Sequence, residues 1–223
     1  MTSVITVDGP SGVGKGTVSE YLSDQLQWNY LNSGALYRSI AWVAMNHSIA
    51  LSDTDGLESA SKNISFSIKD KKLKIEYKRK IIGSLIYNEE VAKTASKVAS
   101  NPKVRESIVN IQRLFKKEPG LVAEGRDMGS VIFPESELKI FLTASIETRA
   151  SRRYKQLKDR EFNVSLPALI KDLDARDKRD KSRENSPLVI PEGAFVIETD
   201  DLRIIDVKKI VKEKVNKTYG TNI

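Results

Sequence analysis

A glycine-rich loop that follows a short apolar run constrains this chain more than any other feature. Val4-Ile5-Thr6-Val7 is typical of a buried strand. After Asp8 comes the segment Gly9-Pro10-Ser11-Gly12-Val13-Gly14-Lys15-Gly16-Thr17. Glycines let successive backbone N–H groups turn inward, the next helix adds its positive dipole end, and Lys15 supplies a point charge. The segment therefore predicts a strand, a phosphate-binding loop and a helix, with a nucleoside triphosphate as ligand.

The loop departs in one position from the commonest phosphate-binding loop. Gly9 to Lys15 keep the G-x-x-x-x-G-K spacing, but Gly16 comes next and the hydroxyl arrives one residue late, at Thr17. A glycine-rich turn that only caps a helix is the alternative. The coincidence of strand, glycine spacing and lysine favours the phosphate loop.

Composition bounds the remaining possibilities. The 223 residues suffice for one domain with insertions or for two small domains. The chain has no cysteine, which excludes disulfides, thiolate nucleophiles and cysteine–metal sites. The run Val4 to Val7 is too short for a signal peptide and no apolar run reaches membrane-spanning length, so we expect a soluble cytoplasmic protein without a membrane partner.

Positive charge is concentrated in one stretch. The net charge is +7, and the stretch from Arg149 to Arg183 contains twelve Lys or Arg residues but only six Asp or Glu residues. Such a cluster attracts polyanions, so nucleic acid is the rival to a polyphosphate ligand. Only Tyr154 and Phe162 lie inside the cluster, which is a poor stacking platform for single strands. A solvated charged face is the plainer interpretation for most of its lysines.

Strand and helix patterns alternate along the chain. Further buried strands are predicted at 28–31, 121–124, 138–142 and 195–198, with helices at 15–27 and from Ser33 onward. This alternation predicts a mainly parallel sheet with ligands at the strand ends, where Gly9 and Gly125 fall. Ile64–Ile68 and Leu73–Tyr77 instead alternate at period two and predict an inserted antiparallel hairpin, followed by helices at about 89–100 and 102–117.

Two arginine-rich helices are predicted near the far end. Arg176, Asp180 and Arg183 share one face of a helix at 166–183, and Arg149, Arg152 and Arg153 do likewise on the helix after Ser145. The charged segment 157–165 between them is predicted to be a mobile lid. Surface ion pairs of Arg176 with Asp172 and Asp180 are the alternative.

Four segments follow one another along the chain: Gly9–Thr17, Asn32-Ser33-Gly34-Ala35-Leu36-Tyr37-Arg38, Glu124-Gly125-Arg126-Asp127-Met128-Gly129 and Ala175-Arg176-Asp177-Lys178-Arg179-Asp180. In this order they resemble the bacterial cytidylate kinases. The hairpin, Ser96-Lys97-Val98-Ala99 and Pro102-Lys103-Val104-Arg105 also look like the enlarged monophosphate-binding domain of that family. Tyr87 departs from an arginine that is frequent there, and Glu124 stands where an aspartate is common.

The resemblance implies a P-loop kinase with a three-layer α/β/α fold and a parallel sheet. It divides the chain into a core (1–32, 98–153 and 167–223), an inserted monophosphate-binding region (33–97) with a small antiparallel sheet, and a lid (154–166). The implied reaction transfers the γ-phosphate of ATP to CMP, and to dCMP, in a monomer that needs Mg²⁺ and binds no nucleic acid.

The implied site residues fall into four groups. Lys15, Arg126, Arg153 and Arg179 are catalytic, and Gly9 to Thr17 bind ATP. Ser33, Arg38, Ser96, Arg105, Arg126, Asp127, Arg176, Asp180 and Arg183 bind CMP. Mg²⁺ has no firm protein ligand and is held by phosphates and water, with Glu124 as a weak candidate.

Elementary chemistry agrees with this assignment. The acceptor phosphate has a second pKa near 6, so it is already largely dianionic and needs no strong base. Catalysis then consists of positioning, charge neutralisation and exclusion of water. The cytosine amine needs an acceptor, for which Asp127 and Ser33 are available. The resemblance implies that Arg105 and Ser96 donate to the ring, that Arg176 and Asp180 face the sugar, and that Arg38, Arg126 and Arg183 face the monophosphate.

Plainer interpretations stay open. Ser33 can be a helix N-cap, Asp127 can fix the turn after its strand, and Ser96 is one of several helix serines. A kinase of UMP, AMP or a hydroxyl acceptor is the nearest rival function. A GTP-dependent switch lacks its Asn-Lys-x-Asp signature, and a nucleic-acid-binding module is the other alternative.

Overall fold

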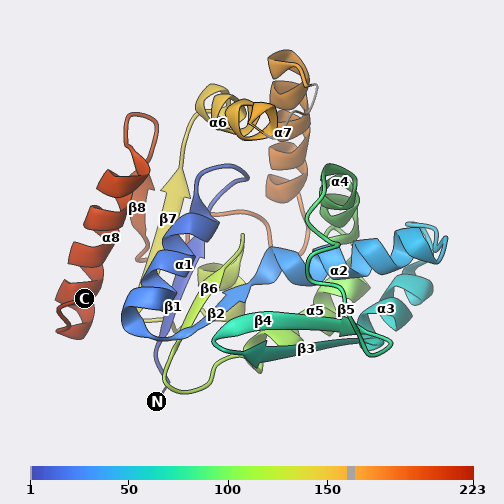
Figure 1. Cartoon of the computed structure of the whole chain (residues 1–223), viewed down its shortest axis with the longest axis horizontal. Coiled ribbons are helices and arrows are strands. Elements are labelled where there is room, and N and C mark those ends of the chain that lie inside the picture. Colours follow the sequence, from blue (N-terminus) through green and yellow to red (C-terminus); the bar gives the residue numbers. More distant parts are fainter. Residues whose placement is uncertain (1, 160–163) are drawn as a thin grey trace.

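A five-stranded parallel sheet forms the centre of the molecule (Figure 1). The structure is a computed structural model that describes residues 2–159 and 164–223. The strand order is β2-β6-β1-β7-β8. The strands are β1 (Val4–Asp8), β2 (Asn29–Asn32), β6 (Leu121–Glu124), β7 (Leu138–Thr143) and β8 (Phe195–Glu198). The predicted mainly parallel sheet is therefore confirmed.

Alternate residues of the central strands supply the two faces of this sheet. Ile5 and Val7 pack with Val18 and Leu22 of α1 (Lys15–Leu26) and with the valines of α8 (Ile204–Tyr219). The opposite face carries Val4 into a core shared with α2 (Ser33–Asn46), α3 (Thr54–Lys62), α4 (Glu89–Val98) and α5 (Pro102–Arg113). A sheet buried on both faces needs apolar residues at successive positions, as β1 has.

The predicted inserted hairpin is present as part of a small antiparallel sheet. Its strands are β3 (Ile64–Lys69), β4 (Lys72–Tyr77) and β5 (Lys80–Ile81). The carbonyl of Lys71 in the β3–β4 turn accepts from the N–H of Tyr30, which joins this sheet to the edge strand β2. The small sheet lies beside the parallel sheet, below α2 in the view of Figure 1.

The helices at the carboxyl end of the parallel sheet position the site. Figure 1 shows α6 (Ile146–Lys158) and α7 (Leu166–Lys181) above that end, with α4 opposite α7. Residues 160–163 of the predicted lid lie outside the described residues. No helix in the described ranges is long and apolar enough to cross a membrane.

Several predicted boundaries are wrong by a few residues. The helix predicted to reach residue 100 ends at Val98, because the side chain of Asn101 accepts from the N–H of Val104 and starts the next helix there. That next helix ends at Arg113 rather than 117. Helices α3 and α8 were not predicted, although Val207, Val211 and Val215 are spaced as on one buried helix face.

Candidate active site

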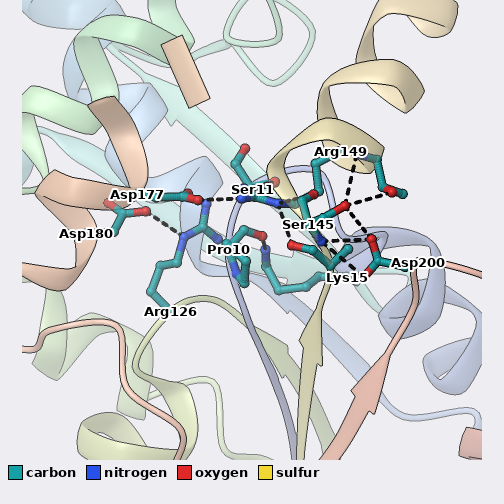
Figure 2. Close-up of polar contacts among 11 residues, drawn as sticks. Pro10, Ser11, Lys15, Arg126, Ser145, Arg149, Asp177, Asp180 and Asp200 are labelled. Carbon is teal, nitrogen blue, oxygen red and sulfur yellow. Dashed lines mark hydrogen bonds and ion pairs between the residues drawn. The ribbon is translucent and has the colours of Figure 1, made fainter. Parts of the chain in front are cut away.

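The predicted phosphate loop lies between the end of β1 and the start of α1. Gly9 needs to be glycine, because its φ is 142° and a Cβ there would collide with the carbonyl oxygen of Leu142. The Lys15 ammonium donates to the carbonyl oxygen of Pro10 at 2.7 Å (Figure 2). Burial and the nearby Arg126 lower the pKa of Lys15 well below its usual range. An anionic ligand would therefore meet a lysine that the loop itself already holds.

Arg149 holds this loop by a hydrogen bond, a role that was not predicted from the sequence. Its guanidinium donates to the carbonyl oxygen of Ser11 at 3.1 Å and to the carboxylate of Asp177 at 2.6 Å (Figure 2). The arginine is 4% exposed. Arg152 instead donates to Thr199 at the end of β8. The predicted arginine face of this helix is therefore divided among different partners. No feature of the sequence distinguishes Arg149 from Arg152 and Arg153.

Glu124 lies beside the unusual glycine of the loop. Its carboxylate accepts from the hydroxyl of Tyr30 at 2.6 Å, and Oε1 lies 3.5 Å from where a Cβ of Gly16 would stand. Burial raises the pKa of Glu124, although Lys15 opposes this shift. Among the described residues, no cluster of three or more acidic or imidazole side chains is suited to hold a metal ion.

All nine residues predicted to bind CMP line one small cavity of about 60 Å³. They come from α2, α4, α5, α7, the turn after β6 and the segment directly after α7, and they are Ser33, Arg38, Ser96, Arg105, Arg126, Asp127, Arg176, Asp180 and Arg183. Ligand pockets usually measure about 300–1,000 Å³. The cavity must therefore widen before a nucleotide can enter it.

A buried ion pair of Arg105 and Asp127 lines this cavity. The two residues are 3% and 2% exposed, and Arg105 also donates to the carbonyl oxygen of Ala99 at 3.1 Å. Asp127 makes no capping bond to its own turn. Asp127 therefore does not fix the turn by capping it.

Ser33 is likewise free of the capping role. The N-cap of α2 is Asn32, whose side chain accepts from the N–H of Ala35 at 3.1 Å. The Ser33 hydroxyl accepts instead from the amide of Gln112 at 2.7 Å. The interpretation of Ser33 as a helix cap is therefore wrong, and Ser33 is one of the residues that line the cavity.

Asp180, which also lines this cavity, joins two of the predicted phosphate arginines. Arg126 Nε donates to it at 2.8 Å, and Arg183 forms a second ion pair with it. Burial alone would raise the pKa of Asp180, but Arg126, Arg183 and Arg176 outweigh this and hold that pKa below its usual range. Arg176 forms neither of the surface ion pairs considered above. Burial lowers the pKa of Arg176 to about 9.

A larger cavity of about 740 Å³ extends from the phosphate loop to α4, α6 and α7. Arg153, Arg176 and Arg179 line it together with Ser11 to Gly14. Three side chains of α4, spaced i, i+4 and i+7, contact the arginine-rich helices across it. These contacts are Glu89 with Arg153, Lys93 Nζ with Asp172 at 2.8 Å, and Ser96 Oγ with Arg179 at 3.4 Å. Asp172 thus pairs with Lys93 and not with Arg176.

Comparison with known proteins gives the family. The family model described as cytidylate kinase matches residues 5–217. The chain belongs to the cytidylate kinase family. It is 42% identical over 222 residues to a cytidylate kinase of Aeromonas salmonicida, covering 99% of this chain and 96% of that protein. A cytidylate kinase of Colwellia psychrerythraea is 44% identical over 209 residues, with 92% of each chain covered.

Solved structures agree on the fold of this cytidylate kinase family member. A crystal structure of a Thermus thermophilus protein covers 99% of both chains at a TM-score of 0.50 and 16% identity. An uncharacterized protein from Eubacterium ventriosum covers 97% of this chain and 99% of its own at a TM-score of 0.52 and 9% identity. These likenesses support the fold alone.

Proposed function

We propose that this chain transfers the γ-phosphate of ATP to CMP, and to dCMP, forming ADP and CDP or dCDP. The observation that carries this proposal is the convergence of the nine predicted CMP-binding residues on one cavity beside the phosphate loop. Membership of the cytidylate kinase family supports the same activity. Two anionic substrates then meet between the phosphate loop, the turn after β6 and helix α7.

On the ATP side, the backbone of Gly9 to Thr17 would hold the triphosphate and Lys15 would contact its β- and γ-phosphates. Arg126, Arg153 and Arg179 would neutralise the charge that develops on the transferred phosphoryl group. Their guanidinium groups come from three separate elements around the two cavities. Phosphate would replace the contact of Lys15 with Pro10 and favour the charged form of the lysine.

On the CMP side, the cytosine amine would donate to Asp127 and Ser33, while Arg105 and Ser96 would donate to the ring. Arg176 and Asp180 would contact the sugar, and Arg38 and Arg183 would join Arg126 around the monophosphate. Since that phosphate is already largely dianionic near pH 7, no side chain has to remove a proton before attack. The arginines orient it and reduce the repulsion between the two substrates.

Magnesium fits this site as an ion bound mainly by phosphate oxygens and water. Mg²⁺ prefers oxygen ligands and usually keeps several waters, so it needs few protein ligands. Glu124, held by Tyr30 beside Gly16, offers one buried carboxylate there, and Thr17 offers one hydroxyl at the loop. When bound, the ion would neutralise charge on the β- and γ-phosphates.

We further propose a cytoplasmic monomer with nucleotides as its ligands, without a nucleic-acid or membrane partner. Much of the positive charge between Arg149 and Arg183 is turned inward, which argues against a nucleic-acid-binding face. Arg152, Arg153, Arg176, Arg179 and Arg183 all line the two cavities.

The proposed division of labour assigns residues 33–97 to monophosphate binding and 154–166 to a lid. We expect the lid to gain hydrogen-exchange protection when a bisubstrate analogue binds, because its phosphates would hold together Arg153, Arg176 and Arg179 of α6 and α7, which line one cavity. Peptides from α8, which packs in the core, serve as the internal control. Equal protection of residues 154–166 with and without the analogue would contradict the lid.

The proposed function is tested by measuring ADP release from ATP against CMP, dCMP, UMP and AMP in a coupled assay. CMP and dCMP should stimulate release most strongly, and UMP should be a poorer acceptor. No stimulation by any monophosphate, together with salt-dependent binding to nucleic acid in a gel shift, would overturn the proposal.

A further inference from the structure

The turn that follows β6 is attached to β1 on both sides of Arg126 and Asp127. Before them, the N–H of Gly125 donates to the carbonyl oxygen of Val7 at 3.1 Å and extends the pairing of β1 with β6. After them, the side chain of Asp8 accepts hydrogen bonds from the turn. This turn therefore takes its position from the last two residues before the phosphate loop.

The Asp8 carboxylate accepts two consecutive backbone N–H groups. Oδ1 accepts from Met128 at 3.0 Å and Oδ2 from Gly129 at 2.8 Å. These are the first N–H groups of a short π-helical turn, η1 (Met128–Ile132), which have no partner within a helix of this kind. Asp8 is fully buried, so both bonds are shielded from water.

An aspartate directly before such a turn would ordinarily cap it with its own side chain. Asp127 holds that position, yet its side chain makes no capping bond and instead pairs with Arg105 in the cavity. Asp8 supplies the acceptors in its place. The carboxylate of Asp127 is thereby left for the cavity, where the proposed function needs an acceptor for the cytosine amine.

Close packing keeps η1 within reach of Asp8. A Cβ on Gly129 would come within 2.7 Å of the Thr6 hydroxyl oxygen, so only a glycine lets this turn lie so near β1. The two hydrogen bonds of Asp8 join it to residues 120 and 121 positions further along the sequence. Asp8 itself lines neither cavity, so it acts on the proposed substrate site only through this turn.

We propose that Asp8 is a positioning residue for base selection: by capping η1 from the neighbouring strand, it frees Asp127 to face Arg105 and the base. This inference rests on the proposed function. Without Asp8, the uncapped N–H groups still have Asp127 at the N-cap position directly before them, with a side chain of the kind that caps a helix. Turning toward them would take its carboxylate away from the cavity.

The test is the ratio of kcat/KM for CMP to that for UMP in Asp8→Asn, an isosteric change that replaces one acceptor by a donor. We expect the ratio to fall at least fivefold, while KM for ATP changes less than twofold. In an Asp127→Asn background the same change should leave the ratio unaltered, because the residue through which Asp8 acts is already lost. Ile5→Ala, a buried change on the same strand, should lower stability and keep the ratio.

A common reduction for both acceptors would overturn the inference and leave Asp8 a purely structural residue. Failure of the wild-type protein to prefer CMP would instead overturn the proposed function. If Asp8→Asn does not fold, Asp8→Ser keeps one acceptor and is expected to lower the ratio too. Amide exchange in the wild-type protein gives a second measurement: Met128 and Gly129 should be protected, and rapid exchange of both would overturn the capping by Asp8.

Discussion

Lys15→Ala is expected to lower kcat at least about a hundredfold while the protein stays folded, because removing one preorganised charge from a developing anion costs about 3–4 kcal/mol. The lysine is 8% exposed, and its ammonium donates a hydrogen bond to the carbonyl oxygen of Pro10. Burial lowers its pKa, so the charged side chain is itself costly to the folded state. We therefore expect the Tm of Lys15→Ala to stay unchanged or to rise slightly.

The measurement is steady-state ADP release with CMP as acceptor, alongside thermal unfolding monitored by circular dichroism. Lys209→Ala on α8 is the matched control, since it removes one exposed lysine that lines neither cavity. Turnover near that of the wild type in Lys15→Ala would contradict the phosphate-loop assignment at its centre.

Local patterns made the parallel sheet, the phosphate loop and the hairpin predictable from the sequence. The run from Val4 to Val7 is mostly apolar, and its strand is buried on both faces. In the segment Ile64 to Tyr77 apolar and polar residues alternate, and one face of its strands is more buried than the other. Family membership was equally accessible, because it depends on motifs that stand in order along the chain. The roles of the individual site residues stay predictions.

Contacts between distant residues were beyond the reach of these patterns. Whether Asp127 caps its own turn depends on Asp8, which lies far away in the sequence. Ser33 is a local case, because the adjacent Asn32, the last residue of β2, takes the capping position. Arg149 was indistinguishable from its neighbouring arginines until its bonds to Ser11 and Asp177 were known. Side chains with several possible partners are decided by tertiary packing, which single-residue preferences do not contain.

Base selection is the property most directly tied to one side chain, and the ion pair in the small cavity decides which variant tests it. Asp127→Ala would leave Arg105 buried without its partner, a change that costs about 3–5 kcal/mol of stability. Asp127→Asn keeps an oxygen for Arg105 and removes only the charge. Its amide can also donate to the C4 carbonyl of uracil, which the carboxylate cannot.

We therefore expect Asp127→Asn to lower kcat/KM for CMP and to raise it for UMP, narrowing their ratio about tenfold or more. An unpaired polar contact in a buried site is worth about 1–3 kcal/mol, and each 1.4 kcal/mol is a factor of ten. Arg38→Ala is the matched control, because the monophosphate is the same on both acceptors and both should suffer equally. A common reduction in Asp127→Asn would mean that Asp127 only holds Arg105, and the acceptor for the cytosine amine would then have to be Ser33.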